Sequence, residues 1–195
     1  DAEGSAPQAA PISPEVERLL GGLAGSWRAI ASADAAEVEV TFSQSVDPSQ
    51  VRGQDNLFRY QTHRPVLVVA FDGADVDDVT RVALGMTALG VSFELCASPG
   101  VDLGPLRSAL RRGVVQAAPW SERVTSGRFA RVRALGDVPS AAYEVANPHV
   151  ACLDASPVLR HARAELRKVV LEQSVSVDFH RYGHLGLREL TASPE

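Results

Sequence analysis

Short apolar runs alternate with helical segments between residues 65 and 153. Residues 66–71 form a continuous apolar run typical of a buried strand, and residues 75–89 have the apolar spacing of a helix. The same reading predicts strands at 91–97, 114–117, 131–135 and 149–153, and short helices or helical turns at 105–112, 120–126 and 139–146. Strands that alternate with helices form parallel sheets covered on both faces. The pattern therefore predicts a Rossmann-like α/β fold with a mostly parallel sheet.

A helix is predicted before this region. Residues 1–11 are small and polar and are interpreted as a linker; Ser13 then provides an N-cap and Pro14 the first helical position. Apolar residues recur at intervals of three and four, at Val16, Leu19, Leu20, Leu23, Trp27 and Ile30. This spacing predicts one helix to about residue 33, although each of its three glycines costs about 1 kcal/mol relative to alanine. We expect this N-terminal helix to need a partner surface.

The last part of the chain has a different period. Residues 162–173 are predicted to be helical, and polar and apolar residues then alternate from Ser174 to Phe179. The alternation places Val175, Val177 and Phe179 on one face of a strand. A lone strand leaves its backbone groups unpaired, and no tight turn follows to encode a local hairpin. The pattern predicts a C-terminal β-flap over residues 174–190 that pairs with a partner domain, and it leaves open whether pairing is within or between chains.

Composition and charge exclude some classes of binding partner and of cellular location. The 195 residues are 45% hydrophobic and 22% charged, with 19 basic and 24 acidic side chains and a net charge of −5. A negative chain lacks the electrostatic basis for general nucleic-acid binding, and the longest apolar run, 65–71, is too short to cross a bilayer. Cys96 and Cys152 lie in or beside apolar segments, which predicts buried thiols and a cytoplasmic location. Because the chain lacks an initiator methionine and a signal segment, we expect a fragment of a longer protein.

Candidate chemistry is sparse. A dinucleotide site needs a glycine-rich turn after the first strand, whereas residues 72–78 contain one glycine and four aspartates, which suit a helix N-terminus. The histidines lack metal-ligand spacing, and no nucleophile-elbow motif occurs. The residues therefore predict no catalytic, cofactor-binding or metal-binding site. The alternative is a free-standing small α/β enzyme or nucleotide-binding protein with an unrecognised site.

Two Arg-Tyr pairs are interface candidates. Arg59 with Tyr60 and Arg181 with Tyr182 occur in two loop-like segments that flank the α/β region. Arginine and tyrosine are enriched at protein interfaces. An ordinary cap on the sheet explains these pairs equally well.

Two longer motifs carry a resemblance. Residues 47–69 read DPSQVRGQDNLFRYQTHRPVLVV and residues 171–186 read LEQSVSVDFHRYGHLG. With the Rossmann-like series between them, they resemble the C-terminal region of long bifunctional proline utilization A enzymes, over about residues 40–190. The family oxidises proline on an FAD barrel domain and then oxidises glutamate semialdehyde to glutamate with NAD. Its extra C-terminal domain looks like an aldehyde dehydrogenase nucleotide-binding fold without the site, and carries a β-flap, whose position residues 174–186 match.

The resemblance implies a function for this chain. It implies a non-catalytic accessory domain that covers the substrate-channelling cavity and packs on the catalytic aldehyde dehydrogenase domain of the same polypeptide. FAD and NAD would belong to the parent enzyme, and the oligomeric state stays open. The chain divides into a linker and N-terminal helix (1–46), a Rossmann-like domain (47–172) and a β-flap with tail (173–195). The expected interface residues are Ser174, Val175, Ser176, Val177, Phe179, Arg181, Tyr182, Arg59 and Tyr60.

Overall fold

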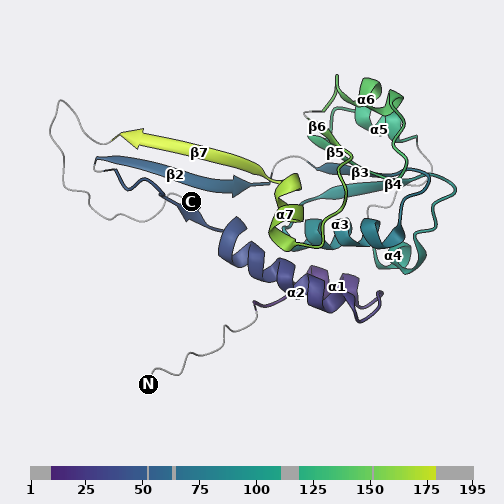
Figure 1. Cartoon of the computed structure of the whole chain (residues 1–195), viewed down its shortest axis with the longest axis horizontal. Coiled ribbons are helices and arrows are strands. Elements are labelled where there is room, and N and C mark those ends of the chain that lie inside the picture. The colour runs from purple at the N-terminus through teal and green to yellow at the C-terminus, as the bar shows by residue number, and fades with distance from the viewer. Residues whose placement is uncertain (1–9, 52, 63–64, 111–118, 151, 179–195) are drawn as a thin grey trace.

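The computed structural model describes residues 10–51, 53–62, 65–110, 119–150 and 152–178. Four of its strands form a parallel sheet in the order β4-β3-β5-β6 (Figure 1). They are β3 (Val66–Ala70), β4 (Phe93–Ala97), β5 (Arg131–Leu135) and β6 (Cys152–Asp154). The predicted α/β fold with a parallel sheet is confirmed. The strand predicted at 114–117 lies outside the described residues.

Helices cover both faces of this sheet. They include α3 (Val76–Ala88), α4 (Gly104–Ala109), α5 (Trp120–Thr125) and α6 (Ala141–Ala146). Successive side chains of β3 point to opposite faces, so Val66 and Val68 pack with α3 and α4 whereas Leu67 and Val69 pack with α5 and α6. The continuous apolar run of β3 is thus explained, because the strand is buried on both sides.

The N-terminal region contains two helices instead of the single predicted one. Helix α1 (Pro14–Leu20) begins at the expected cap, where Ser13 Oγ accepts a hydrogen bond from Val16 N at 3.3 Å. Helix α2 (Trp27–Glu37) follows a turn and continues into a π-helix, η1 (Val38–Phe42). The prediction of one helix to residue 33 is wrong because the intervening segment is rich in glycine. A Cβ atom at Gly22 would lie 2.9 Å from Ala109 Cβ of α4, so this turn depends on a small residue.

A second, antiparallel sheet projects from the α/β body (Figure 1). Its strands are β1 (Ser45–Val46), β2 (Gln54–Gln61) and β7 (Leu171–Asp178), in the order β1-β2-β7. We call these three strands the β-arm. Arg59 and Tyr60 therefore lie in a strand, and their placement in a loop is corrected.

The helix predicted over residues 162–173 ends early. Helix α7 (Ala162–Leu166) passes into a 3₁₀ turn, η2 (Arg167–Val169), and β7 then begins. Residues 171–173 pair with β2, and this tertiary pairing overrides the local helical spacing. No helix in the described part of the chain is both long enough and apolar enough to cross a membrane.

Candidate functional site

The first candidate site is the crevice at the carboxyl ends of the parallel strands, where sheets of this type bind ligands. The chain goes from β3 to β4 on one side and later to β5 on the other, so the topological switch point lies between the carboxyl ends of β3 and β5. Asp72 to Asp78 follow β3, and Gly136 and Asp137 follow β5. A dinucleotide would place its pyrophosphate between these two loops.

Backbone contacts close that crevice. The amide of Asp137 donates to Asp72 O at 2.8 Å, and the amide of Phe71 donates to Leu135 O at 2.9 Å. Gly136 has φ +85°, and a Cβ atom there would lie 2.7 Å from backbone atoms of Phe71, Asp72 and Ala74. The two loops touch each other directly, which leaves no room for a pyrophosphate between them.

The loops that follow β3 and β5 carry carboxylates where a dinucleotide-binding site has free backbone amides. Asp75 is the N-cap of α3, and its Oδ1 accepts from the amide of Asp77 at 2.8 Å, which confirms the predicted capping role. The carboxylate of Asp137 lies over Gly73, because a Cβ atom on that glycine would be 2.8 Å from Asp137 Oδ2. Among the described residues, no group of three or more His, Cys, Asp or Glu is placed to hold a metal ion. This end of the sheet presents negative charge.

We predict that the 195-residue chain does not bind NAD. The amide of Asp137 and the amide of Asp77 at the N-terminus of α3 already have partners, and the surrounding aspartates repel a pyrophosphate. Calorimetric titration with NAD measures this directly. A micromolar dissociation constant, worth about −8 kcal/mol, would instead support the alternative of a nucleotide-binding protein.

The β-arm is the second candidate site, and its strands pair within the chain. Strand β7 is antiparallel to β2 from Gln54 opposite Asp178 to Gln61 opposite Leu171. The sequence left open whether this strand pairs within or between chains, and in the described residues it pairs with β2 of the same chain, a polar strand more than 100 residues earlier. In the described part of the chain, β7 pairs on one side only, so its other edge offers unpaired backbone groups.

The two faces of the β-arm differ. Tyr60 lies on one face, where its ring is 4.9 Å from Phe42 of η1 and 5.3 Å from Phe58, whereas Ser174 and Ser176 on the same face are exposed. The opposite face carries Leu57 and Val175 as cross-strand partners, together with Val177, which is 45% exposed. The predicted alternation of residues 174–178 is confirmed in the described strand. Among the described residues, this face thus leaves an apolar patch at Val175 and Val177 partly uncovered.

The predicted interface residues divide between these faces. Arg59 shares the apolar face with Val175 and Val177, and its Nε donates to Gln173 Oε1 at 2.7 Å. Ser174 and Ser176 lie on the other face with Tyr60, and Ser176 Oγ donates to Asn56 Oδ1 at 2.6 Å. The structure therefore separates Arg59 from its neighbour Tyr60. Phe179, Arg181 and Tyr182 lie outside the described residues.

Sequence reasoning missed one residue that organises the β-arm. Asp47, between β1 and β2, accepts backbone hydrogen bonds from Ser49, Gln50 and Asn56 at 2.9–3.1 Å. The amides of Gln50 and Asn56, with further help from Ser49, lower the pKa of Asp47 to about 2. The sequence Asp-Pro-Ser at residues 47–49 could have indicated this role, since the aspartate side chain often accepts hydrogen bonds from the backbone amides that follow it.

The cysteines occupy different environments. Cys96 in β4 is buried, and burial raises the pKa of its thiol. Cys152 is exposed, so the prediction that both thiols are buried is wrong for this residue. The reason is that β6 is the last described strand on its side of the sheet and is covered incompletely.

We expect a thiol reagent to modify Cys152 rapidly in the native protein. Cys96 should react only as fast as the protein unfolds, because its thiol is buried and its raised pKa keeps it protonated. Mass spectrometry of a labelling time course measures both rates. In the variant Cys152→Ser the fast phase should vanish, and a fast phase that persists there would contradict the burial of Cys96.

The class of fold follows from these features: a Rossmann-like α/β domain with a closed switch point and a projecting β-arm. No protein-family model and no curated protein sequence matches the chain. Among solved structures, a Proline Utilization A (PutA) from Corynebacterium freiburgense has a TM-score of 0.61 and 24% identity, over 92% of this chain and 16% of that one. This chain thus spans about a sixth of that enzyme's length.

Two further solved structures are dehydrogenases. A histidinol dehydrogenase from Elizabethkingia anophelis matches with a TM-score of 0.50 and 13% identity, over 78% of this chain and 40% of that one. An NAD-dependent benzaldehyde dehydrogenase from Corynebacterium glutamicum matches with a TM-score of 0.46 and 18% identity, over 72% of this chain and 36% of that one. At these identities the first two likenesses show a shared fold.

Proposed function

We propose that this chain is a non-catalytic accessory domain of a bifunctional enzyme that converts proline to glutamate through pyrroline-5-carboxylate. The observation that carries the proposal is the structural match of 92% of the chain to a segment of a Proline Utilization A. The closed switch point supports the non-catalytic part, because Asp72 and Asp137 occupy the position where a dehydrogenase holds its dinucleotide. FAD and NAD would then be bound by other domains of the parent enzyme, in the cytoplasm.

The proposed partner is the catalytic aldehyde dehydrogenase domain of the same polypeptide. The β-arm has the two features that such a contact needs, an apolar patch at Val175 and Val177 and an edge of β7 that no described strand pairs with. We propose that the β-arm packs on that domain and that the α/β body covers the channelling cavity. The proposed division keeps residues 1–46 as linker and N-terminal region, 47–172 as the α/β domain and 173–195 as flap and tail.

We predict that removing residues 174–195 from the full-length parent enzyme impairs one half-reaction only. Proline oxidation on the separate barrel should be unchanged, because the β-arm contacts the other catalytic domain. Semialdehyde oxidation, measured as NADH production, should fall together with the coupled transfer between sites. Unchanged NADH production would mean that the β-arm does not support semialdehyde oxidation, contrary to the proposed function.

A point substitution sharpens this test. Val177→Lys puts a charge on this apolar patch without placing a like charge opposite Asp55, and we expect it to reduce NADH production by about tenfold, equivalent to roughly 1.4 kcal/mol. Ser174→Lys is the control for added charge, since Ser174 is exposed on the opposite face of the same strand. Equal losses in the two variants would mean that the apolar face has no special part in the contact.

A further inference from the structure

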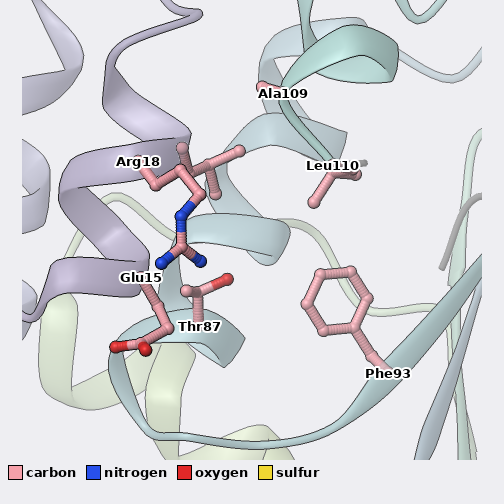
Figure 2. Close-up of a pocket in the computed structure, with 7 residues that line it drawn as sticks. Glu15, Arg18, Thr87, Phe93, Ala109 and Leu110 are labelled. Carbon is pink, nitrogen blue, oxygen red and sulfur yellow. The ribbon is translucent and has the colours of Figure 1, made fainter. Parts of the chain in front are cut away.

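A cavity outside the sites described so far lies beside α1. It has a volume of about 400 Å³, is open to solvent on one side, and is lined by α1, the end of α3, the start of β4 and the end of α4 (Figure 2). This volume falls within the roughly 300–1,000 Å³ of small-molecule sites. On one side of the cavity the described chain stops at Leu110 and resumes at residue 119. The proposed function makes no use of this cavity.

One wall of the cavity is polar and carries both charges. Glu15 and Arg18 lie one turn apart on α1, and among the described residues neither makes a hydrogen bond or an ion pair through its side chain. Their neighbour Glu17, by contrast, is paired with Arg28 at 2.7 and 2.8 Å. The hydroxyl of Thr87 donates to Ala83 O at 2.7 Å, so its oxygen can still accept a hydrogen bond.

The other wall is apolar. Figure 2 shows Phe93 and Leu110 across the cavity from Arg18 and Thr87. Leu19, which is 3% exposed, adds to the apolar lining. The cavity therefore combines one cation, one anion and a neutral acceptor with a surface that would contact a small hydrocarbon group.

We propose that this cavity binds a free α-amino acid with an apolar side chain. Arg18 donates to the ligand carboxylate, while Glu15 and the Thr87 oxygen accept from its ammonium group. The side chain of the ligand lies against Phe93 and Leu110. A ligand with only a carboxylate would give Glu15 no cation to bind, and a ligand with only an ammonium group would give Arg18 no anion to bind. An uncharged molecule would offer a counter-charge to neither residue. The zwitterion is the small ligand that matches both charges.

Calorimetric titration of the 195-residue chain with L-leucine tests the proposal. We expect saturable binding of leucine, and binding at least about tenfold weaker for 4-methylpentanoate, which lacks the ammonium group, and for 3-methylbutylamine, which lacks the carboxylate. Absence of saturable leucine binding at millimolar concentration would overturn the proposal. Equal binding of leucine and 4-methylpentanoate would overturn the recognition of a zwitterion.

Variants locate the site. Arg18→Gln and Glu15→Gln should each weaken leucine binding by at least about tenfold, because each removes one charged partner. Glu17→Gln is the control on the same helix, because Glu17 does not line the cavity, and it should leave the affinity unchanged. All three side chains are exposed, so thermal unfolding should confirm that the variants are folded. Full leucine affinity in Arg18→Gln would show that any binding occurs elsewhere.

Discussion

Replacing Asp34 by alanine is expected to lower the free energy of unfolding by about 3–5 kcal/mol, because the substitution leaves a buried arginine without its counter-charge. Asp34 of α2 and Arg81 of α3 form a bidentate ion pair with distances of 2.7 and 2.9 Å. Both side chains are 0% exposed. Burial raises the pKa of Asp34 to about 6, while the Arg81 guanidinium opposes that rise.

The chain provides a matched exposed pair as a control. Glu17 of α1 and Arg28 of α2 have the same bidentate geometry, but their side chains are 43% and 59% exposed. Water screens this pair, so Glu17→Ala should change the unfolding midpoint far less than Asp34→Ala. Urea unfolding of both variants measures the difference. Similar losses in the two variants would mean that burial does not set the cost.

A double variant separates the ion pair from the buried charge. Asp34→Ala combined with Arg81→Met removes the charge that Asp34→Ala leaves behind, and should recover a large part of the lost stability. If the double variant is less stable than Asp34→Ala alone, the buried charge is not the cause of the loss.

The α/β body could be predicted because its signals are local. The strand β3 is a continuous apolar run, and α3 follows an aspartate-rich cap, so both elements were found from their own residues. The break between α1 and α2 was missed because the apolar spacing continues across the glycines. The glycines end α1, and the packing of Gly22 against Ala109, a contact distant in sequence, fixes the turn that follows.

The β-arm and the buried ion pair depend on distant partners. Strand β2 reads QDNLFRYQ and has no strong apolar alternation, so its pairing with β7 could not be found from either segment alone. Asp34, however, lies at the spacing of Trp27 and Ala31 on the buried side of α2. A charged residue at that spacing is a usable signal for a buried ion pair, although its partner Arg81 could not be named from sequence.

Substituting Gly136 by alanine is expected to destabilise the protein by roughly 2–5 kcal/mol. About 1–2 kcal/mol comes from the positive φ, and roughly 1–3 kcal/mol from forcing a Cβ atom into a packed site. The backbone atoms in question, Phe71 O, Asp72 O and Ala74 N, are each 2.7 Å from the position of that atom. They belong to the turn that fills the switch point, so they cannot move without opening it.

Gly90→Ala is the matched control for this substitution. Gly90 has a similar φ of +67°, but a Cβ atom there meets nothing within 4 Å. Its loss should therefore be limited to the roughly 1–2 kcal/mol of the backbone conformation. The excess loss in Gly136→Ala, measured by urea unfolding, reports the contact between the loops after β3 and β5. Equal losses would mean that these loops do not touch in solution and that the crevice between β3 and β5 is open to a dinucleotide.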